Sequence, residues 1–180
     1  MSNKYDTERY IEPKKALPEF IVDKLPPDIT GETERLEFFM GEAVKMAKVA
    51  ALHGDVPVGC VIVRHNEIIA AAENRREMAK DATAHAEILA IKDACRALGG
   101  WRLVASEIFV TLEPCPMCAG AIVNARVPKV TVGAREPKSG AFGGMFDICS
   151  LPLNHRPEYR FGILEDECTE LTRGFFKSKR

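Results

Sequence analysis

Apolar residues in the first half of the chain change from a helical to a strand-like spacing. From Glu34, apolar side chains recur every three or four residues as far as Gly54, which predicts a long helix with one face in the core. Two short apolar runs follow, over 56–63 and 67–73, and the polar letters RHNE separate them. This pattern is typical of a β-hairpin.

The second half of the chain repeats strands and helices in alternation. A helix is predicted from Thr83 to a pair of glycines, because threonine suits an N-cap and glycine ends helices. The pattern then predicts a strand over 107–113, a helix over 116–127, a strand over 129–134 and a last helix over 164–177. Alternation of this kind after an opening hairpin predicts an α/β layered domain with a mixed sheet.

The first 34 residues lack a sustained period and contain four prolines among many charges. We interpret residues 1–34 as an N-terminal extension that is extended or partly disordered. We expect it to dock on the body of the protein through Tyr10, Phe20 and Ile21. The folded domain is therefore expected over residues 35–180.

Composition is consistent with one ordinary domain. The chain has 180 residues, 46% of them hydrophobic, which is enough to fill a core. No window approaches the roughly eighteen unbroken apolar residues that span a bilayer, and the first letters, MSNKYDTERY, are charged where a signal peptide is apolar. We therefore expect a cytoplasmic protein without a membrane segment, whose six cysteines are thiols or metal ligands and not a disulfide framework.

The charge balance excludes a broadly basic surface of the kind that binds nucleic acid along its whole length. The chain has 25 lysines and arginines and 26 aspartates and glutamates, which gives a formal net charge of -1. A local patch is still compatible with this balance. The last letters, TRGFFKSKR, place basic residues around Phe175 and Phe176, a combination that suits phosphate contact and base stacking. The alternative is a solvated tail whose phenylalanines pack on the core.

Two cysteines, Cys115 and Cys118, lie where a predicted helix follows a strand. Alone, this Cys-x-x-Cys can be a redox dithiol, half of a zinc site or incidental. His85 lies at the start of another helix, and α/β domains place ligands at the carboxyl ends of neighbouring strands, so the three side chains could meet. They would leave a zinc ion one open position for water, as in catalytic sites. Glu87 could then exchange a proton with that water, or merely complement the helix dipole.

The letters HAE at 85–87 and PCPMC at 114–118 match the zinc deaminase signature, His-x-Glu followed by Pro-Cys-x-x-Cys. Together with VPVG at 56–59, WRL at 101–103 and NHR at 154–156, they make the chain from about Glu34 onward resemble the bacterial tRNA-specific adenosine deaminases. The resemblance implies a three-layer α/β/α cytidine-deaminase-like domain with a central mixed sheet of about five strands. It also implies hydrolytic deamination of adenosine to inosine at the wobble position of a tRNA anticodon.

The resemblance further implies roles for individual residues. Zinc, one ion per chain, would be bound by His85, Cys115 and Cys118, and Glu87 would carry the proton of the zinc-activated water. The target nucleoside would be bound by Asn74, whose amide offers both a donor and an acceptor. The partners implied are a tRNA anticodon stem-loop and a second copy of the chain in a homodimer. The remaining RNA contacts would come from Glu136, Lys138, Phe175, Phe176 and Lys177.

The chain departs from the family pattern at a few positions. Glu136 stands where many relatives have aspartate, and Ala82 replaces a frequent proline before Thr83. Pro116 also occurs in guanine deaminases, which share the letters PCPMC. The alternatives are therefore a deaminase of a free base or nucleoside such as guanine, a non-catalytic RNA-binding or structural zinc module, and a dithiol oxidoreductase.

Overall fold

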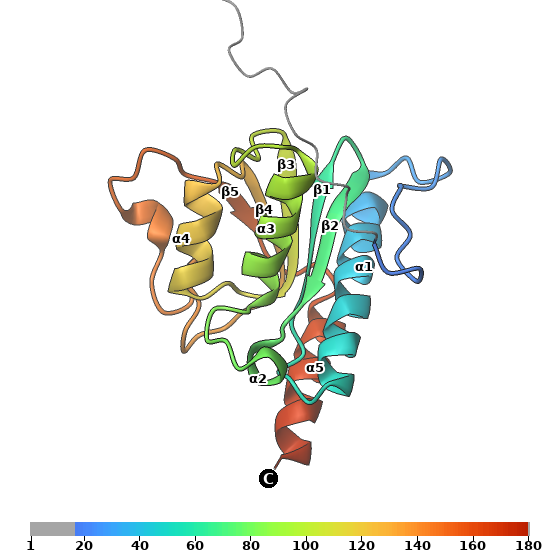
Figure 1. Cartoon of the computed structure of the whole chain (residues 1–180), viewed down its shortest axis with the longest axis vertical. Coiled ribbons are helices and arrows are strands. Elements are labelled where there is room, and N and C mark those ends of the chain that lie inside the picture. The colour runs from blue at the N-terminus through green and yellow to red at the C-terminus, as the bar shows by residue number, and fades with distance from the viewer. Residues whose placement is uncertain (1–16, 180) are drawn as a thin grey trace, which may run out of the picture.

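The computed structural model describes residues 17–179, which form one sheet with helices packed on both faces (Figure 1). The strands are β1 (Gly59–Arg64), β2 (Glu67–Glu73), β3 (Ser106–Leu112), β4 (Lys129–Ala134) and β5 (Glu158–Arg160). The α-helices are α1 (Glu32–Leu52), α2 (Arg76–Ala79), α3 (Ala86–Ala97), α4 (Pro116–Asn124) and α5 (Glu165–Ser178), and a short 3-10 helix, η1, spans Ile148–Ser150.

The sheet has the strand order β2-β1-β3-β4-β5 and is mixed. Strand β1 runs antiparallel to β2 and β3, whereas β3, β4 and β5 are parallel. Helices α1 and α5 pack on one face, and α3 and α4 lie side by side over the other (Figure 1). This is the three-layer α/β/α architecture with five strands that the family resemblance implies. None of the helices within residues 17–179 is both long and apolar enough to cross a membrane.

Strand β1 shows why its residues form a nearly continuous apolar run. Cys60 and Ile62 belong to the hydrophobic cluster under α3 and α4. Val61 and Val63 point the other way, into the cluster under α1 and α5. A central strand with helices on both faces buries every side chain, so it carries no alternation of apolar and polar residues.

Helix α1 crosses β1 very closely at Gly59. A Cβ atom at this position would overlap the carbonyl oxygen of Ala43 and the amide nitrogen of Ala47. Glycine is therefore required here by the close approach of two backbones. The contact places the start of β1 directly against the middle of α1.

The predicted helix start at Thr83 is wrong, because α3 begins at Ala86. The carboxylate of Asp81 accepts hydrogen bonds from the amide and the hydroxyl of Thr83, at 2.8 and 2.7 Å, and holds a turn before the helix. His85 is the N-cap, with extended backbone (φ -75°, ψ 150°). The helix predicted over 116–127 also ends early, at Asn124, because the chain turns into the left-handed region shortly after it.

Three elements were absent from the sequence prediction. The fifth strand, β5, exposes all three of its residues and shows no apolar pattern, and it pairs only through β4. Helix α2 buries none of its residues, and the carboxylate of Asp55 accepts its first amides, those of Glu77 and Met78, at 2.6 and 3.0 Å. The third element, η1, is a single 3-10 turn in the loop before β5. Contacts from distant parts of the chain define β5 and α2, whereas η1 is capped locally by the side chain of Asp147, which accepts from the amide of Cys149 at 2.9 Å.

The described part of the N-terminal extension follows the edge of the sheet. Ile21 is buried, as predicted, and Lys24 forms an isolated bridge with Glu67 of β2. Phe20 is 47% exposed and therefore does not dock as predicted, and Tyr10 lies outside the described residues. The end of the predicted extension belongs to the first turn of α1.

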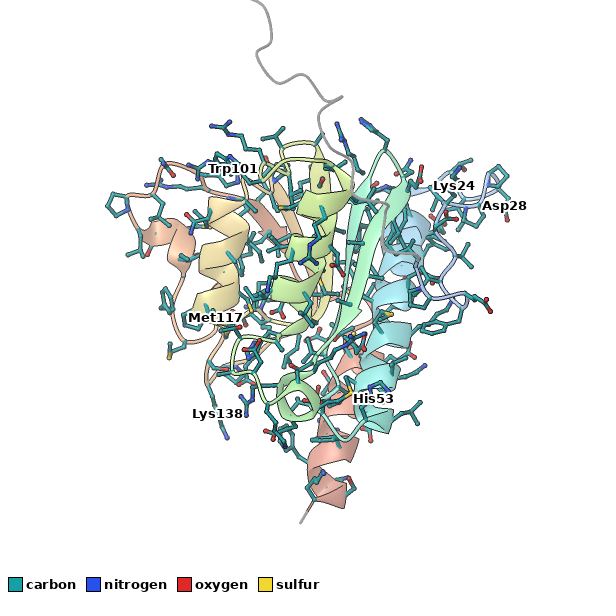
Figure 2. The ribbon with its side chains drawn as sticks, in the orientation of Figure 1. Lys24, Asp28, His53, Trp101, Met117 and Lys138 are labelled. Atoms are coloured by element: carbon teal, nitrogen blue, oxygen red, sulfur yellow. The ribbon has the colours of Figure 1, made fainter. Side chains whose placement is uncertain are left out.

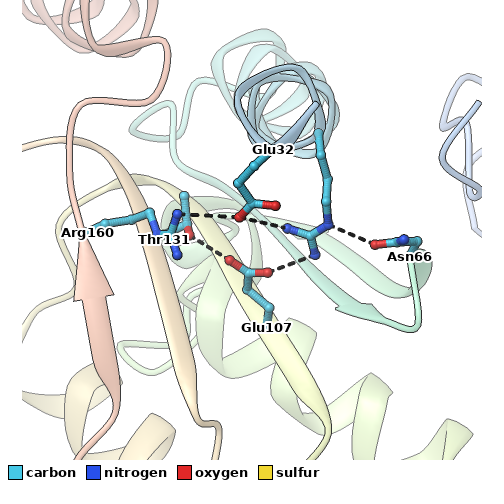
Figure 3. A network of polar contacts seen from close by, with 6 residues as sticks. Glu32, Asn66, Glu107, Thr131 and Arg160 are labelled. Carbon is cyan, nitrogen blue, oxygen red and sulfur yellow. Dashed lines mark hydrogen bonds and ion pairs between the residues drawn. The ribbon is translucent and has the colours of Figure 1, made fainter. Parts of the chain in front are cut away.

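A polar network joins α1 to the sheet at the amino end of β3 (Figure 3). Glu107 pairs with the guanidinium of Arg35 at 2.9 Å and accepts a hydrogen bond from the hydroxyl of Thr131 at 2.8 Å. Arg35 also donates to the side chain of Asn66 in the hairpin turn, at 2.8 Å. One carboxylate thus connects α1, β3 and β4, and through Arg35 the hairpin.

Replacing Glu107 with alanine is expected to lower the free energy of unfolding by about 2 kcal/mol, because it removes the nearest carboxylate from a mostly buried guanidinium and the acceptor of the buried Thr131 hydroxyl. The side chains of Arg35 and Glu107 are only 18% and 8% exposed. Urea unfolding at one protein concentration measures the change. Glu167→Ala is the control, since its ion pair with Lys48 is 46% and 55% exposed and is worth less than about 0.5 kcal/mol. Equal losses in the two variants would contradict the assignment.

Candidate active site

A pocket lies at the end of the sheet where β2, β3 and β4 finish and β1 begins. The pocket is lined by five of the residues singled out from the sequence: Asn74, His85, Glu87, Cys115 and Glu136. They come from the segments that follow β2, β3 and β4, with Glu87 in the first turn of α3. The ends of the parallel strands β3 and β4 meet here, in agreement with the usual place of ligands in α/β domains.

Three potential metal ligands converge at the start of α3 and α4. His85 is the N-cap of α3 and Cys115 is the N-cap of α4, both with extended backbone and neither bonding its own helix through the side chain. Pro116 occupies the first position of α4, where its missing amide costs nothing, and Cys118 follows within the same turn. Two helix amino termini therefore face the cluster and favour thiolate anions there.

The geometry of this cluster fits zinc. The Nδ1 atom of His85 lies 3.7 Å from the sulfur of Cys115 and 3.6 Å from that of Cys118, and the three ligand atoms lie within 4.8 Å of one another. A tetrahedral ion with Zn–N of about 2.0 Å and Zn–S of about 2.3 Å needs nitrogen-to-sulfur distances of roughly 3.5 Å. Nitrogen and sulfur are also the donors zinc prefers, and three of them leave one position open.

The two thiols differ in acidity because they are hydrogen-bonded to each other. That hydrogen bond lowers the pKa of Cys115 to about 4, with a further contribution from His85. The same interaction, together with burial, raises the pKa of Cys118 above the ordinary thiol value. The hydrogen bond with Cys115 also raises the pKa of His85. Binding of a cation must therefore displace protons from this cluster.

Glu87 is a buried carboxyl beside the metal cluster, 3% exposed. Burial raises its pKa, while a hydrogen bond from its own amide and the charge of His85 act in the opposite direction. Residues two apart in the middle of a helix point to different sides, but His85 precedes α3, so both side chains line the pocket. A carboxyl with a raised pKa is suited to accepting and returning a proton.

One wall of the pocket is the segment between β2 and α3. Asn74, 7% exposed, donates through its side-chain nitrogen to the carbonyl of Val56 at 3.2 Å, and its backbone amide donates to the carbonyl of Val58 at 2.9 Å. These bonds orient the Asn74 amide at the pocket wall. Arg76 lies on the same wall and is exposed, so it places a positive charge at the pocket.

The opposite wall is a loop that follows β4. Glu136 and Ser139 line the pocket from this loop. Glu113, which directly follows β3, is 4% exposed and also lines the pocket. Sequence reasoning did not single out Glu113 or Arg76. A glutamate between an apolar strand and the letters PCPMC was the available signal for Glu113.

The other predicted RNA-contacting residues do not line the pocket. Lys138 is exposed on the loop after β4 (Figure 2). Phe175, Phe176 and Lys177 belong to α5, whose C-terminal end extends beyond the same end of the molecule (Figure 1). Phe176 is 50% exposed, so the phenylalanines are not fully packed on the core.

Comparison with known proteins identifies similar sequences. The model of the cytidine and deoxycytidylate deaminase zinc-binding region matches residues 33–134. The chain is 48% identical over 145 residues to the tRNA-specific adenosine deaminase of Bacillus subtilis, covering 80% of this chain and 90% of that protein. It is 47% identical to the tRNA-specific adenosine deaminase of Aquifex aeolicus, covering 80% of this chain and 95% of that protein.

Solved structures show the same similarity in three dimensions. A structure from a study of A-to-I editing by tRNA:A34 deaminases at the wobble position matches with a TM-score of 0.70 and 41% identity, covering 74% of this chain and 97% of that one. A guanine deaminase from Nitrosomonas europaea matches with a TM-score of 0.67 and 27% identity, covering 89% and 93%. Both candidate substrate classes are therefore represented among the similar folds.

Proposed function

Because this chain belongs to the cytidine and deoxycytidylate deaminase zinc-binding family, we propose that it deaminates adenosine to inosine at the wobble position of a tRNA anticodon. The observation that carries the proposal is the identity of 48% to a tRNA-specific adenosine deaminase over nearly the whole of that protein. The convergence of the three metal ligands beside a buried glutamate supports the chemistry.

The reaction consumes one water molecule and releases one ammonia molecule. Zinc held by His85, Cys115 and Cys118 would act as a Lewis acid that lowers the pKa of a bound water. Glu87 takes a proton from the water as it attacks C6 of the adenine ring. It returns a proton to the exocyclic nitrogen, which leaves as ammonia. Its burial and raised pKa support both transfers.

The pocket walls and the C-terminal helix would bind the RNA. Asn74 is held where its amide can hydrogen-bond the nucleoside. The RNA backbone would be contacted by Glu136 at the pocket wall and by Lys138 on the exposed part of the same loop. Bases of the anticodon loop would stack on the rings of Phe175 and Phe176, and the ammonium of Lys177 would pair with a phosphate. The ammonium of Lys179 lies 5.3 Å from the centre of the Phe175 ring and adds positive charge at the same place. A loop base is already unpaired, so its entry into the pocket costs less than extraction from a duplex.

We further propose that the protein acts as a homodimer in the cytoplasm. Large apolar side chains, including Trp101 at 53% and Val104 at 62%, are exposed in the loop after α3, and a second subunit would cover them. A dimer would also bring basic residues of two chains to one anionic substrate. This would compensate for the net charge of -1 of each chain, which by itself does not attract RNA. The cytoplasmic assignment follows from the proposed tRNA substrate.

The second candidate is deamination of a free base such as guanine. It is favoured by the match of TM-score 0.67 to the guanine deaminase and by the shared letters PCPMC. Such an enzyme needs the zinc ligands and Glu87 but has no use for exposed aromatic and basic residues at the C-terminal end of α5. Substrate choice therefore distinguishes the two candidates.

Zinc-loaded protein is expected to form inosine in an anticodon stem-loop with a kcat/KM at least about a hundredfold above that for free adenosine or guanine, because stacking and phosphate contacts add binding energy. Parallel assays of inosine formation and ammonia release measure this. Efficient release of ammonia from guanine, with an unmodified stem-loop, would assign the protein to the second candidate.

The C-terminal helix has a matched control for its part in this test. Phe176→Ala is expected to raise KM for the stem-loop about tenfold through the loss of one stacking side chain. Phe20→Ala removes a phenylalanine of similar exposure, 47% against 50%, from the N-terminal segment and leaves KM unchanged. If both variants bind the stem-loop as the wild type does, α5 has no part in RNA binding.

A further inference from the structure

Glu113 is a buried carboxylate whose hydrogen bonds come from backbone amides. It accepts from the amide of Glu136 at 3.0 Å, from that of Phe142 at 3.0 Å and from that of Gly144 at 2.8 Å. Within residues 17–179, no lysine, arginine or histidine side chain forms an ion pair with it. The carboxylate therefore binds a stretch of main chain, residues 136–144, which we call the Glu113 loop.

The loop is shaped to fit closely around this carboxylate. A Cβ atom at Gly140 would overlap the carboxyl group of Glu113, and one at Gly144 would lie 2.7 Å from its Oε2. The amide of Ala141 donates to the carbonyl of Pro114 at 2.9 Å, which adds a further contact beside the metal ligand Cys115. The space that the carboxylate occupies explains the glycine at 140, whereas at 144 an added Cβ would also overlap the carbonyl oxygen of Glu136.

The Glu113 loop also forms one wall of the active-site pocket. Glu136 and Ser139 line the pocket, and the carboxylate of Glu136 accepts from the amide of Lys138 at 2.9 Å, which orders the outer part of the loop. The carboxylate of Glu113 thus connects the segment that carries Cys115 to the wall that faces the substrate. A shift in such a wall is enough to weaken the contacts that bind the substrate.

We propose that Glu113 is a positioning residue that fixes the Glu113 loop against the metal centre and thereby sets the affinity for RNA. The proposal rests on the proposed function, because it assigns to the loop the contacts with the anticodon stem-loop. A carboxylate is needed here because both oxygens accept from amides, three in all, and no other side chain of this size offers two acceptor oxygens without a donor.

Glu113→Gln is the first test. Glutamine has the same shape, but its NH2 group must face backbone N–H donors, so one anchor of the loop is lost. We expect the Kd of the zinc-loaded protein for a fluorescently labelled stem-loop to rise about tenfold, with kcat within about threefold of the wild type and unchanged zinc content. Amide hydrogen exchange over residues 136–144 is expected to accelerate at least about tenfold.

Glu42→Gln is the matched control. Glu42 is also a buried glutamate, 3% exposed, that accepts from a backbone amide, that of Val22 at 3.1 Å, and it pairs in addition with Lys45 at 2.8 Å. It lies on α1, under the N-terminal segment and away from the pocket. Its replacement is expected to leave Kd, kcat and exchange of the Glu113 loop unchanged. Equal effects of the two variants on Kd would show general destabilisation and overturn the proposal.

Gly140→Ala tests the same contact from the other side. The added methyl group pushes the loop off an intact Glu113, so Kd is expected to rise as in Glu113→Gln. The double variant Glu113→Ala with Gly140→Ala is compared with the two single variants. The increase in Kd of the double variant is expected to be smaller than the product of the two single increases, because removal of the carboxylate makes room for the methyl group. Gly100→Ala, with no atom within 4 Å of the added Cβ, is the control. An increase in Kd of the double variant equal to the product of the single increases would overturn the proposal. This comparison remains informative even if Glu113→Gln is unstable.

Measuring stem-loop binding and deamination separately distinguishes a failure of this proposal from a failure of the proposed function. A wild type that deaminates the stem-loop, with Kd and loop exchange unaffected by Glu113→Gln, overturns the inference alone. A wild type that binds the stem-loop without deaminating it, and loses that binding in Glu113→Gln, supports the inference and refutes the proposed function. Loss of zinc in Glu113→Gln would assign the residue to the metal centre and also overturn the proposal.

Discussion

Glu87→Gln is expected to lower kcat on an anticodon stem-loop by at least about a thousandfold while the protein keeps one zinc ion per chain. Glutamine preserves the shape of the side chain but cannot take a proton from water or return one to the leaving nitrogen. Glu87 is 3% exposed, so bulk water has little access to replace it. Steady-state inosine formation at saturating stem-loop gives kcat, and elemental analysis gives the zinc content.

Glu87→Asp tests whether the loss of kcat in Glu87→Gln comes from the loss of proton transfer, because aspartate keeps a carboxyl group and changes only its position. Aspartate retains a titratable group one methylene further from the substrate and is expected to be intermediate, with a loss of about ten- to a hundredfold. Unchanged turnover in a zinc-loaded Glu87→Gln protein would exclude Glu87 as the proton carrier. It would support the reading of Glu87 as a residue that only complements the helix dipole of α3.

Removal of the metal is expected to abolish deamination, and Cys118→Ala is expected to do the same by removing one of three protein ligands. Cys118 is fully buried in the cluster, so no solvent-exposed group can replace its sulfur. Protein treated with a strong chelator should regain activity with stoichiometric zinc. Zinc content, ammonia release and thermal unfolding of the same samples measure the outcome, and the metal-free protein is expected to be less stable.

The pH dependence of zinc binding has a definite sign. The pKa of Cys118 is raised by its hydrogen bond with Cys115 and by burial, so a proton must leave this thiol when zinc binds. Protons therefore compete with zinc, and the apparent affinity is expected to fall as the pH is lowered. Competition with a chelator at several pH values measures this, and an affinity that rises on acidification would contradict it.

Cys95→Ser is the control for both metal experiments. Cys95 is a half-buried thiol on α3, outside the three-ligand cluster, and its replacement should leave zinc and activity intact. The same samples test the dithiol alternative. A metal-free wild type with a reversible Cys115–Cys118 disulfide would support an oxidoreductase, whereas thiols shielded from modification by bound zinc would exclude it.

Local periodicity predicted those elements that bury a regular face. The long helix α1 and the strands β1 to β4 came from apolar spacing, because each packs its side chains against a core on at least one side. Strand β5 and helix α2 bury no residue and could not be found in this way. Strand β5 exists because β4 offers a free edge, and α2 exists because Asp55 caps its first amides.

The start of α3 shows how a small error in an element changes the reading of a site. With a helix from Thr83, His85 and Glu87 would point to different sides, and their cooperation depended on loose geometry in the first turn. The hydrogen bonds of Asp81 with Thr83 delay the helix to Ala86, so His85 reaches the pocket from outside the helix. His85 and Glu87 therefore line the same pocket because of the turn before α3, which helical spacing alone does not predict.

The sequence by itself determined the family, because the letters HAE and PCPMC match the zinc deaminase signature and the family model covers residues 33–134. The tertiary structure alone decided how the pocket around the residues of this signature is held. Asp55 and Glu113 act through backbone amides 22 to 31 residues away, and every residue but proline carries such an amide, so no pattern of letters marks the partners. Only the folded chain shows that the carboxylate next to PCPMC holds the loop that forms the wall of the pocket.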